Sequence, residues 1–382
     1  MGNCSNETII EEKGMGSQNK ININDFTKLY PIGKSGFGPI WKVKLKENKN
    51  KQRNKNTENG EFSKTNIFAM KEYSKAKIYL KKSIKSVENN RKIIETLNHK
   101  LICKMYYAFQ DTGNLYMITD YFSGGDLRYF ICRRNYFEER ETKFIIACIA
   151  LIINYLHENN VIHRDIKPEK FVFGKDGYLR ITGFGVSFKC KKGETVISAS
   201  GTPGYMAPET IINQPHNFSV DYFALGVMLY ELMMGERPYQ GKDRKIIKEE
   251  MFNIEINLDE DDLPNGWDIN VIDLINRLLK RKKKFRLGSN GFDEVKNHPW
   301  FKDIQWDKIE NCEFVSPIKI KEGDNFDEEY AAEKEDESIY EGNKELYINK
   351  INESLVYKDF YFNYEDKIKN DENKYDGNKK DK

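Results

Sequence analysis

Residues 161–185 read VIHRDIKPEKFVFGKDGYLRITGFG. The stretch begins with an apolar run that predicts a strand, places Asp165 beside Arg164 on a tight loop, and follows them with Lys167. A short hairpin then leads to a Gly-Phe-Gly turn at 183–185. An aspartate and a lysine on such a loop are groups that phosphoryl transfer uses. The stretch therefore decides the predicted fold and locates a candidate active site.

The same stretch resembles the catalytic loop and metal loop of protein kinases, whose pattern is His-Arg-Asp-x-Lys-x-x-Asn followed by Asp-Phe-Gly. The resemblance implies that Asp165 is the catalytic base and that Lys167 contacts the transferred group. Two positions differ, because Lys170 replaces the asparagine and Gly183 replaces the aspartate. Those two positions hold the metal ions in the family. We therefore expect ATP as the ligand, no metal ligands at these positions, and a doubtful role for Mg²⁺.

The composition is that of an ordinary globular protein. The chain has 382 residues, of which 39% are hydrophobic, so it can form one two-lobed domain with a tail. Its 62 basic and 60 acidic residues give a net charge of +2, which indicates no nucleic-acid partner. We find no Cys-x-x-Cys spacing and no apolar secretory leader, and the longest apolar run, 144–155, fits a buried helix. These features predict a reduced, cytoplasmic protein.

The first residues, Met-Gly-Asn-Cys-Ser-Asn, contain a candidate acylation site. Gly2 is the residue to which myristate is attached, although Asn6 stands where the acylation pattern has Ser or Thr. One myristoyl chain binds membranes only marginally, so palmitoylation of Cys4 would supply the second signal. We expect residues 1–25 to form an N-terminal segment that associates with the cytosolic face of a membrane. A chance Gly-Asn-Cys start is the alternative.

A glycine-rich loop is predicted between two apolar runs near residues 32–40. Glycines let backbone amides approach phosphates closely, although a hairpin of this kind is often only a turn. The loop resembles the kinase pattern Gly-x-Gly-x-x-Gly-x-Val, with Ser35 at the middle glycine and Pro39 removing one amide. By resemblance, the loop residues that contact the nucleotide are Ile32, Gly33, Gly36, Gly38 and Ile40.

The strand predicted at 67–71 resembles the one whose lysine grips the α and β phosphates of the nucleotide. This resemblance assigns Ala69 and Lys71 to the nucleotide. In active kinases a glutamate of the following helix holds that lysine. The alignment places Asn90 at the glutamate position, and Glu88 lies on a different helical face.

Residues 115–127 resemble the last small-lobe strand, the hinge and the first large-lobe helix of kinases. Thr119 falls at the gatekeeper position. The backbone of Asp120 and Phe122 would bind adenine, and Asp126 would reach the ribose or a basic substrate residue. Two further nucleotide contacts follow from the resemblance, at Lys170 and Val172.

Residues 198–209, SASGTPGYMAPE, match the end of a kinase activation segment. Ser198 lies where the AGC group carries its activating phosphate, and a phosphate there could pair with Arg164. Thr202 together with Lys167 is typical of Ser/Thr rather than Tyr kinases. The resemblance also implies a set of acidic side chains that would select basic peptides, namely Asp126, Glu169 and Glu231.

Two polar positions resemble the structural scaffold of the kinase domain. The resemblance places Asp221 at one of them and pairs Arg286 with Glu209 in a buried ion pair. The domain ends near residue 301.

Residues 302–365 resemble the AGC tail that wraps back over the small lobe. Tyr357 and Phe360, an aromatic pair three residues apart, suit two pockets on that lobe, and a weakly ordered tail is the alternative. Tyr361 stands where the tail motif usually carries a phosphorylated Ser or Thr. Residues 366–382 are rich in Lys, Asn and Asp and predict disorder.

The predicted fold is α+β, with a small antiparallel β lobe that contains one helix, a larger mainly helical lobe, and the tail. The predicted boundaries are 26–119 for the small lobe and 120–301 for the large lobe. A Lys/Asn-rich insertion at 46–66 is expected to be a solvated loop, with a polybasic membrane contact as the alternative. Within the AGC group the resemblance is to the cAMP-dependent and "yet another novel kinase" branches.

Three functions are compatible with this sequence. The first is a pseudokinase or scaffold that binds ATP and protein partners with impaired catalysis. The second is a Ser/Thr kinase with an unusual metal arrangement. The third is a kinase fold that no longer binds nucleotide.

Overall fold

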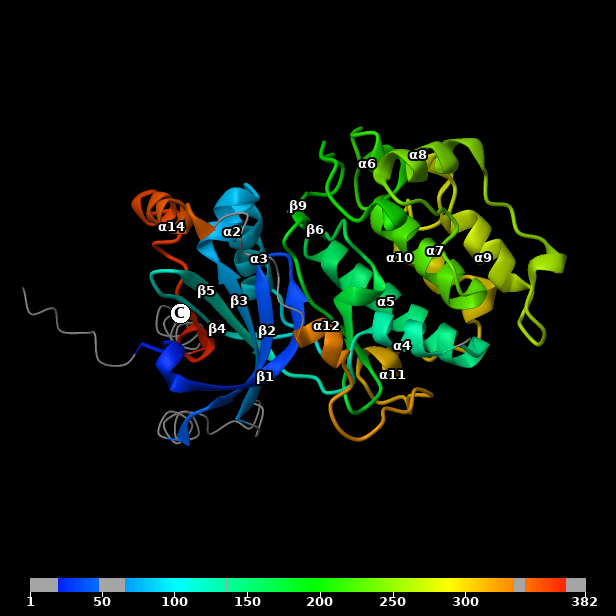
Figure 1. Cartoon of the computed structure of the whole chain (residues 1–382). Helices are drawn as coiled ribbons and strands as arrows, with labels where there is room; N and C mark the ends of the chain where they lie inside the picture. Colours follow the sequence, from blue (N-terminus) through cyan, green and yellow to red (C-terminus); the bar gives the residue numbers. More distant parts are fainter. Residues whose placement is uncertain (1–19, 48–65, 135–136, 333–340, 369–382) are drawn as a thin grey trace, which may run out of the picture.

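The computed structural model describes residues 20–47, 66–134, 137–332 and 341–368. Figure 1 shows a strand-rich small lobe beside a larger helical lobe, joined by the chain that follows β5. The predicted two-lobed α+β architecture is therefore confirmed. The glycine-rich loop belongs to the small lobe, and the stretch 161–185 belongs to the large one.

The small lobe is built on a six-stranded antiparallel sheet. Its strand order is β1-β2-β3-β5-β4-β10, so the last strand comes from the C-terminal tail. Alternate residues of the strands face a buried aromatic and aliphatic cluster, the pattern of a half-buried sheet. The strand bounds are β1 (Phe26–Ser35), β2 (Gly38–Leu45), β3 (Ile67–Ser74), β4 (Met105–Gln110), β5 (Asn114–Asp120) and β10 (Phe362–Asn363).

Two helices follow β3 and cover the other face of the sheet. They are α2 (Lys75–Leu80), which Ser74 caps, and α3 (Ile84–Thr96). Val87, Asn90 and Ile94 are buried on α3 at spacings of three and four, so they lie on one helical face. This face turns Asn90 toward the cleft between the lobes.

The large lobe packs around α5 (Glu139–Glu158) and α7 (Ser219–Met234). The predicted buried helix over 144–155 is confirmed, since it forms the buried part of α5. The remaining helices of this lobe are α4 (Leu127–Arg133), α6 (Pro208–Ile211), α8 (Arg244–Asn253), α9 (Asn270–Leu278), α10 (Phe292–Lys296) and α11 (Trp306–Glu310).

Two short antiparallel strand pairs hold the catalytic loop and the Gly-Phe-Gly turn at the cleft. Their strands are β6 (Val161–Ile162) with β9 (Phe188–Lys189) and β7 (Phe171–Phe173) with β8 (Leu179–Ile181). A 3₁₀ turn, η2 (Pro168–Lys170), precedes β7, and another, η3 (Pro203–Tyr205), lies within the end of the activation segment.

Buried polar side chains fix these loops to the lobe. Asp221 accepts hydrogen bonds of 2.8 Å from the backbone amides of both His163 and Arg164. The predicted buried ion pair is confirmed, because Arg286 donates two hydrogen bonds, of 2.7 and 2.9 Å, to the carboxylate of Glu209. The catalytic loop and activation segment are thereby attached to the rigid helical core.

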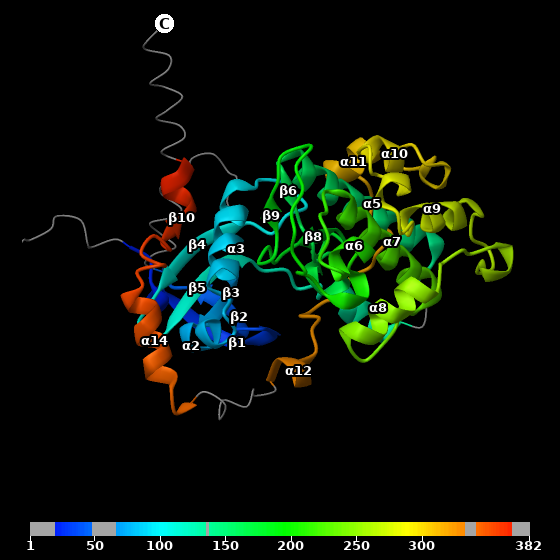
Figure 2. The same cartoon turned by 90° about the horizontal axis from the view of Figure 1, so that it is seen from above.

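The C-terminal tail returns to the small lobe. Both views place α14 (Lys344–Glu353) beside α2, whereas α12 (Glu328–Ala332) contacts β1 (Figures 1 and 2). Tyr357 and Phe360 are buried in a T-shaped pair, and the Tyr357 hydroxyl donates to the carbonyl of Ile84 at the start of α3. The tail therefore covers α3 and completes the sheet through β10.

Several predicted segments lie wholly or largely outside the described residues. They include Gly2, Cys4 and most of the insertion 46–66. Residues 364–368 are helical, and Lys367 donates to the carbonyl of Glu95, so the predicted start of disorder at residue 366 is too early. The rest of that segment, 369–382, also lies outside the described part.

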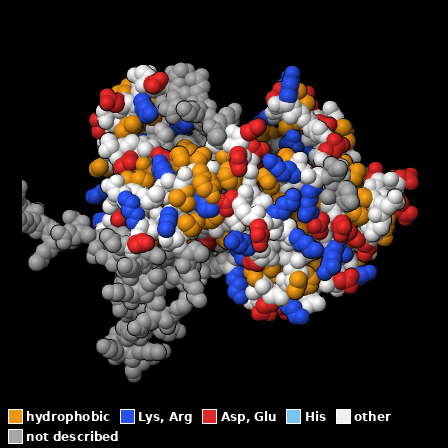
Figure 3. All heavy atoms as spheres, turned by 60° about the horizontal axis from the view of Figure 1, so that its bottom comes forward, with side chains coloured by type: hydrophobic (Ala, Val, Ile, Leu, Met, Phe, Trp, Pro, Cys, Tyr) orange, Lys and Arg blue, Asp and Glu red, His pale blue; other side chains and the backbone are white. Residues whose placement is uncertain are grey.

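The surface shows no field of a single sign on the face drawn in Figure 3. Acidic and basic side chains are interspersed over the large lobe, and hydrophobic side chains gather on the small lobe near the junction. No helix of the described ranges is both long and apolar enough to cross a membrane.

Candidate active site

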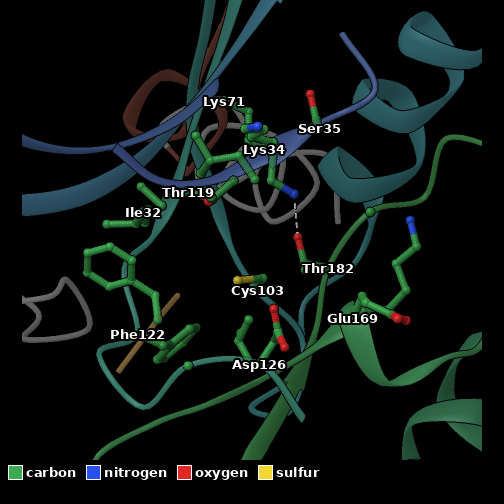
Figure 4. Close-up of a pocket in the computed structure, with 18 of the residues that line it drawn as sticks. Ile32, Lys34, Ser35, Lys71, Cys103, Thr119, Phe122, Asp126, Glu169 and Thr182 are labelled. Carbon is green, nitrogen blue, oxygen red and sulfur yellow. Dashed lines mark hydrogen bonds between the residues drawn. The ribbon is translucent and has the colours of Figure 1, made fainter. Parts of the chain in front are cut away.

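A cleft of about 980 Å³ lies between the two lobes. The glycine-rich loop, β3, the hinge and the catalytic loop all contribute to its walls (Figure 4). It brings together residues that lie far apart along the chain, including Ile32, Val172 and Asp327. Twelve of the predicted nucleotide-contacting residues line it, namely Ile32, Gly33, Gly36, Ile40, Ala69, Lys71, Thr119, Asp120, Phe122, Asp126, Lys170 and Val172.

Ser35 forms hydrogen bonds with the backbone of the glycine-rich loop to which it belongs. The Ser35 hydroxyl donates to the carbonyl of Gly38 at 2.9 Å and accepts from the amide of Phe37. Gly38 itself is not part of the cleft wall. A Cβ atom there would lie 2.5 Å from the carbonyl oxygen of Glu72, so this glycine permits close packing of β2 on β3. Gly38 therefore has a packing role between β2 and β3, and its predicted nucleotide contact stays a prediction.

The hinge presents its backbone, and not the Asp120 side chain, to the cleft. The Asp120 carboxylate accepts hydrogen bonds from the Lys104 amide at 2.9 Å and the Tyr106 hydroxyl at 2.8 Å. Burial raises the pKa of this carboxyl above its ordinary value, although both hydrogen bonds oppose the shift. An adenine-sized ligand would therefore meet the hinge through peptide groups, in a cleft that Ile32 and Val172 also line.

Lys71 is half-buried in the cleft, and its Nζ donates a hydrogen bond of 2.6 Å to the Thr182 hydroxyl (Figure 4). No carboxylate of the described residues forms an ion pair with Lys71. Burial, aided by repulsion from Lys170, lowers the pKa of Lys71 to about 8. Its ammonium group is therefore poised to gain stabilisation from an anion that enters the cleft.

Asn90 stands where the family pattern has the partner glutamate of this lysine. Its side-chain oxygen instead accepts a hydrogen bond of 2.7 Å from the backbone amide of Phe184, and its amide group contacts the Tyr73 hydroxyl at 3.3 Å. Both partners are buried. Asn90 thus connects α3 to the Gly-Phe-Gly turn without contributing a negative charge.

Lys170 reaches over Gly183 toward the catalytic loop. Its Nζ lies 3.1 Å from Oδ2 of Asp165. A Cβ atom at Gly183 would lie 3.0 Å from the same Nζ, so the lysine takes the space that a side chain at residue 183 would need. Gly183 also has a φ of +84°, which favours glycine. The two departures from the family pattern are therefore spatially coupled.

Asp165 is held on both of its oxygens. The Thr202 hydroxyl donates to Oδ1 at 2.7 Å, opposite the ion pair with Lys170. Burial alone would raise the pKa of Asp165, but Lys170, Lys167 and Thr202 outweigh it and hold the pKa below the ordinary value. The carboxylate is ionised at neutral pH, and the three groups predicted to be catalytic, Asp165, Lys167 and Thr202, gather at one place.

Arg164 is the predicted partner of a phosphate on Ser198. Within the described part of the chain, its guanidinium instead donates from Nε to the Val186 carbonyl at 2.7 Å and lies over the Phe188 ring. Its Nη1 is buried and has no hydrogen-bond partner. The Ser198 hydroxyl is hydrogen-bonded to that of Ser200 at 2.7 Å.

The predicted docking carboxylates do not form one open acidic surface. Asp126 caps α4 by accepting a hydrogen bond from the amide of Tyr129. Glu169 and Glu231 both accept from the guanidinium of Arg128. The last predicted regulatory residue, Tyr361, is half-buried, and its hydroxyl accepts from the amide of Ile21 at 3.4 Å.

Comparison with known proteins agrees with this arrangement. The family model for the protein kinase domain matches residues 57–301. The chain belongs to the protein kinase family. It is 33% identical over 313 residues to the serine/threonine-protein kinase sgk-1 of Caenorhabditis elegans, and this alignment covers 81% of the chain and 63% of the relative.

Further kinase relatives are similar to a comparable extent. The cAMP-dependent protein kinase type 3 of Saccharomyces cerevisiae is 30% identical over 311 residues, with 80% of this chain and 72% of the relative covered. Protein kinase 2 of Dictyostelium discoideum is 32% identical over 315 residues, which cover 82% of this chain and 61% of that relative. The chain thus spans about three-fifths of the length of several relatives. These similarities confirm the predicted relationship to AGC-type Ser/Thr kinases.

The kinase fold implies ATP together with Mg²⁺, and the residues of this cleft fit the two differently. A nucleotide suits the cleft, because the half-buried Lys71 and the backbone of the hinge both line it. Neither family metal position offers an oxygen ligand, since they carry Lys170 and Gly183. No three His, Cys, Asp or Glu side chains of the described ranges are grouped to hold a metal ion. The site therefore does not fit the metal arrangement of the kinase family.

Two contacts of this kinase cleft were missed by the sequence analysis. Thr182 accepts a hydrogen bond from Lys71, and Arg128 forms ion pairs with both Glu169 and Glu231. The sequence offered one signal for the second contact. It is Arg128, a basic residue on the first turn of the helix that begins directly after Asp126.

Proposed function

We propose that this protein kinase homologue binds ATP without requiring a divalent ion, transfers the γ-phosphate poorly, and acts mainly as a signalling scaffold. The observation that carries the proposal is the position of the Lys170 ammonium, 3.1 Å from Asp165 and over Gly183. A fixed cation there supports the phosphates in the region where the family uses metal ions.

The charge balance supports this role for Lys170. Relative to the family pattern, Gly183 removes one negative charge and Lys170 adds one positive charge. The site gains two positive units, formally the charge of one magnesium ion. Lys71 adds a further cation, half-buried in the cleft. A triphosphate therefore finds compensating charge in the protein itself.

The same substitutions argue against efficient catalysis. The loss of one electrostatic stabiliser costs a factor of about 10² to 10³ in rate, so two independent losses would cost about 10⁴ to 10⁶. An ammonium group also cannot coordinate the β and γ oxygens together in the manner of a metal ion. The ion pair with Lys170 further holds Asp165 in its weakly basic form.

Calorimetric titration with ATP tests nucleotide binding. We expect dissociation constants in chelator and in Mg²⁺ that agree within about threefold. A Lys170→Met variant should bind ATP at least about tenfold more weakly in chelator, because it lacks the ammonium. Binding that occurs only with Mg²⁺ would contradict the proposal. Absence of binding in every condition would favour a fold that no longer takes nucleotide.

A Ser/Thr kinase of low activity is the second candidate, favoured by the 2.7 Å hydrogen bond from Thr202 to Asp165. These groups, with Lys167, retain the arrangement for a hydroxyl acceptor. Transfer of labelled γ-phosphate to a Ser peptide should be measured with Mg²⁺, Mn²⁺ and chelator, beside an Asp165→Asn variant. A signal above that variant supports the second candidate, and equal signals support the scaffold.

Phosphorylation of Ser198 is part of the proposal, supported by the unpartnered, buried Nη1 of Arg164. A phosphate oxygen would supply the missing acceptor. We expect a Ser198→Glu variant to have a higher melting temperature than a Ser200→Glu control. Equal melting temperatures would remove the support for this pairing.

Acylation of Gly2 and Cys4 is also proposed, as the basis of membrane association on the cytosolic face. Two lipid chains bind a membrane stably, whereas one does not. In cell fractionation, Gly2→Ala should abolish membrane recovery and Cys4→Ser should reduce it. Recovery of Gly2→Ala in the membrane fraction at the level of the parent would refute the idea.

A further inference from the structure

Arg128 occupies an acidic pocket beside the catalytic loop. Its Nε donates to Glu169 at 2.9 Å and its Nη1 donates to Glu231 at 2.8 Å. Its Nη2 donates to the Tyr205 hydroxyl, which in turn donates to Glu231 at 2.6 Å. The guanidinium thus bridges η2, α7 and η3 from its position on the first turn of α4.

This arrangement is largely enclosed by protein. The Glu231 side chain is 5% exposed and the Arg128 side chain is 27% exposed, whereas Glu169 at the rim is 41% exposed. Burial opposes the charge of Arg128, but the hydrogen bond that it donates to Glu231 and the charges of Glu231 and Glu169 together outweigh burial and raise the pKa of the guanidinium. A buried, bidentate and hydrogen-bonded pair of this kind is the strong form of an ion pair. Its disruption leaves Glu231 as an uncompensated buried charge.

A second arginine lies on the other side of Tyr205. The Arg237 guanidinium lies over the Tyr205 ring at 5.8 Å from its centroid. It also packs against Gly204, where any Cβ atom would collide with it. No carboxylate among the described residues forms an ion pair with Arg237. This surface therefore presents a cation that is free to meet an acidic group.

The two arginines change the charge of this surface. Glu169 and Glu231 alone contribute two negative charges, which would attract arginines of a bound peptide. Arg128 and Arg237 contribute two positive charges, which offset those of Glu169 and Glu231, and Asp126 is the remaining carboxylate beside them. An incoming basic side chain would need to displace Arg128 from the buried Glu231 and from Glu169 at the rim before it could form equivalent bonds.

We propose that Arg128 is a specificity-determining residue that fills the basic-residue subsite from within the chain, so that the docking surface takes acidic rather than basic peptide segments, with Arg237 as their contact. The inference rests on the proposed docking of protein partners by this kinase fold, and it does not depend on phosphoryl transfer. A peptide carboxylate at Arg237 would form a charge-assisted hydrogen bond that no residue of the described ranges supplies.

Fluorescence anisotropy with three labelled peptides tests the inference on the full chain. The peptides share one serine-containing sequence and differ only in a residue pair before the serine, which is Arg-Arg, Ala-Ala or Glu-Glu. For the parent we expect the Glu-Glu peptide to bind about tenfold tighter than the Ala-Ala peptide, and the Arg-Arg peptide to gain nothing. Tighter binding of the Arg-Arg peptide by the parent would overturn the proposal, as would equal binding of all three.

Variants separate the two arginines. Arg128→Met exposes the carboxylates and should increase affinity for the Arg-Arg peptide by about tenfold. A double variant with Glu231→Gln, which removes the unpaired buried charge, should fold and lose that gain. Arg237→Ala should weaken binding of the Glu-Glu peptide by about tenfold, whereas Arg140→Ala, at an exposed arginine of α5, should not. Unchanged peptide preferences in Arg128→Met and Arg237→Ala would overturn the assignment.

A thermal-shift titration with ATP on the same samples reports nucleotide binding separately. Stabilisation by ATP together with the wrong peptide preference would refute only the docking inference. The expected peptide preference without stabilisation by ATP would retain the inference and refute nucleotide binding.

Discussion

The side-chain oxygen of Asn90 on α3 accepts a 2.7 Å hydrogen bond from the backbone amide of Phe184 in the Gly-Phe-Gly turn. This contact joins the small lobe to the large lobe across the rear of the cleft. It does not involve Lys71, whose partner is Thr182. At Asn90, α3 is therefore attached to the Gly-Phe-Gly turn by a neutral hydrogen bond rather than by an ion pair with Lys71.

Asn90→Ala should destabilise the protein by about 1 to 3 kcal/mol, because the buried amide of Phe184 loses its acceptor. The free energy of unfolding from urea denaturation is the measurement. Asn90→Asp keeps an acceptor at this position and should lose less stability at a pH low enough to protonate the new carboxyl, where no charge is buried. Unfolding curves of Asn90→Ala that coincide with those of the parent would contradict the role of this bond.

Nucleotide affinity should depend on pH through Lys71, whose pKa is about 8. The charged lysine attracts phosphate, so affinity should fall by up to about tenfold per pH unit above pH 8, until the higher pKa of the complex is reached. Calorimetry between pH 6.5 and 9.5 measures this profile. Lys71→Met should bind weakly with a flat profile, and Asn90→Glu should move the decline to higher pH. A flat profile for the parent would be inconsistent with this role.

Lys71 should also make the free energy of unfolding depend on pH. The contribution of Lys71 to this free energy should rise with pH, whereas nucleotide affinity falls. The unfolded chain keeps this proton up to the ordinary pKa of 10.5, whereas the native state releases it at about 8. Between these values the unfolded state binds more protons, so the contribution of Lys71 to the free energy of unfolding rises with pH. The difference between parent and Lys71→Met in urea denaturation should therefore shift in favour of the parent from pH 7.5 to 9.5.

Restoration of the family residues should restore metal dependence. Gly183→Asp alone should destabilise the protein, because residue 183 has a φ of +84° and its Cβ would lie 3.0 Å from Nζ of Lys170. The double variant with Lys170→Asn removes that contact and supplies two oxygen ligands. We expect ATP binding by this variant to increase at least about tenfold with Mg²⁺. Gly183→Ala with Lys170→Asn is the control with the same backbone strain and no carboxylate, and an equal response of both variants would contradict the prediction.

The tail should stabilise the small lobe through its buried aromatic residues. Phe360 packs against Tyr357 and lies beneath the Arg91 guanidinium of α3. Phe360→Ala should lower the free energy of unfolding by about 3 to 5 kcal/mol if the tail stays bound. If detachment of the tail requires less free energy than this, the tail should instead dissociate from the small lobe. Hydrogen exchange in β4, which pairs with β10, distinguishes the two outcomes. Leu355→Ala is the control, because Leu355 is 64% exposed, and it should change neither the free energy of unfolding nor the hydrogen exchange of β4. Equal protection of β4 in the two variants would argue against a stabilising role of the tail.

The sequence by itself determined the fold and identified most of the nucleotide-site residues that line the cleft. Glycines, an aspartate and lysines at fixed spacings, followed by periodic apolar runs, specify the strands, helices and loops that form the cleft. Local patterns of this kind are readable because each depends on neighbouring residues. They also identified the two departures from the family pattern, Lys170 and Gly183.

Only the tertiary structure decided how those departures and the neighbouring charges are used. Lys170 lies over Gly183, Lys71 pairs with Thr182, and Arg128 fills the pocket of Glu169 and Glu231. Each of these contacts joins residues of different elements, and long side chains choose partners by burial and distance in three dimensions rather than by spacing along the chain. Arg128 shows the consequence, since its sequence neighbours do not reveal that it neutralises a carboxylate 103 residues away.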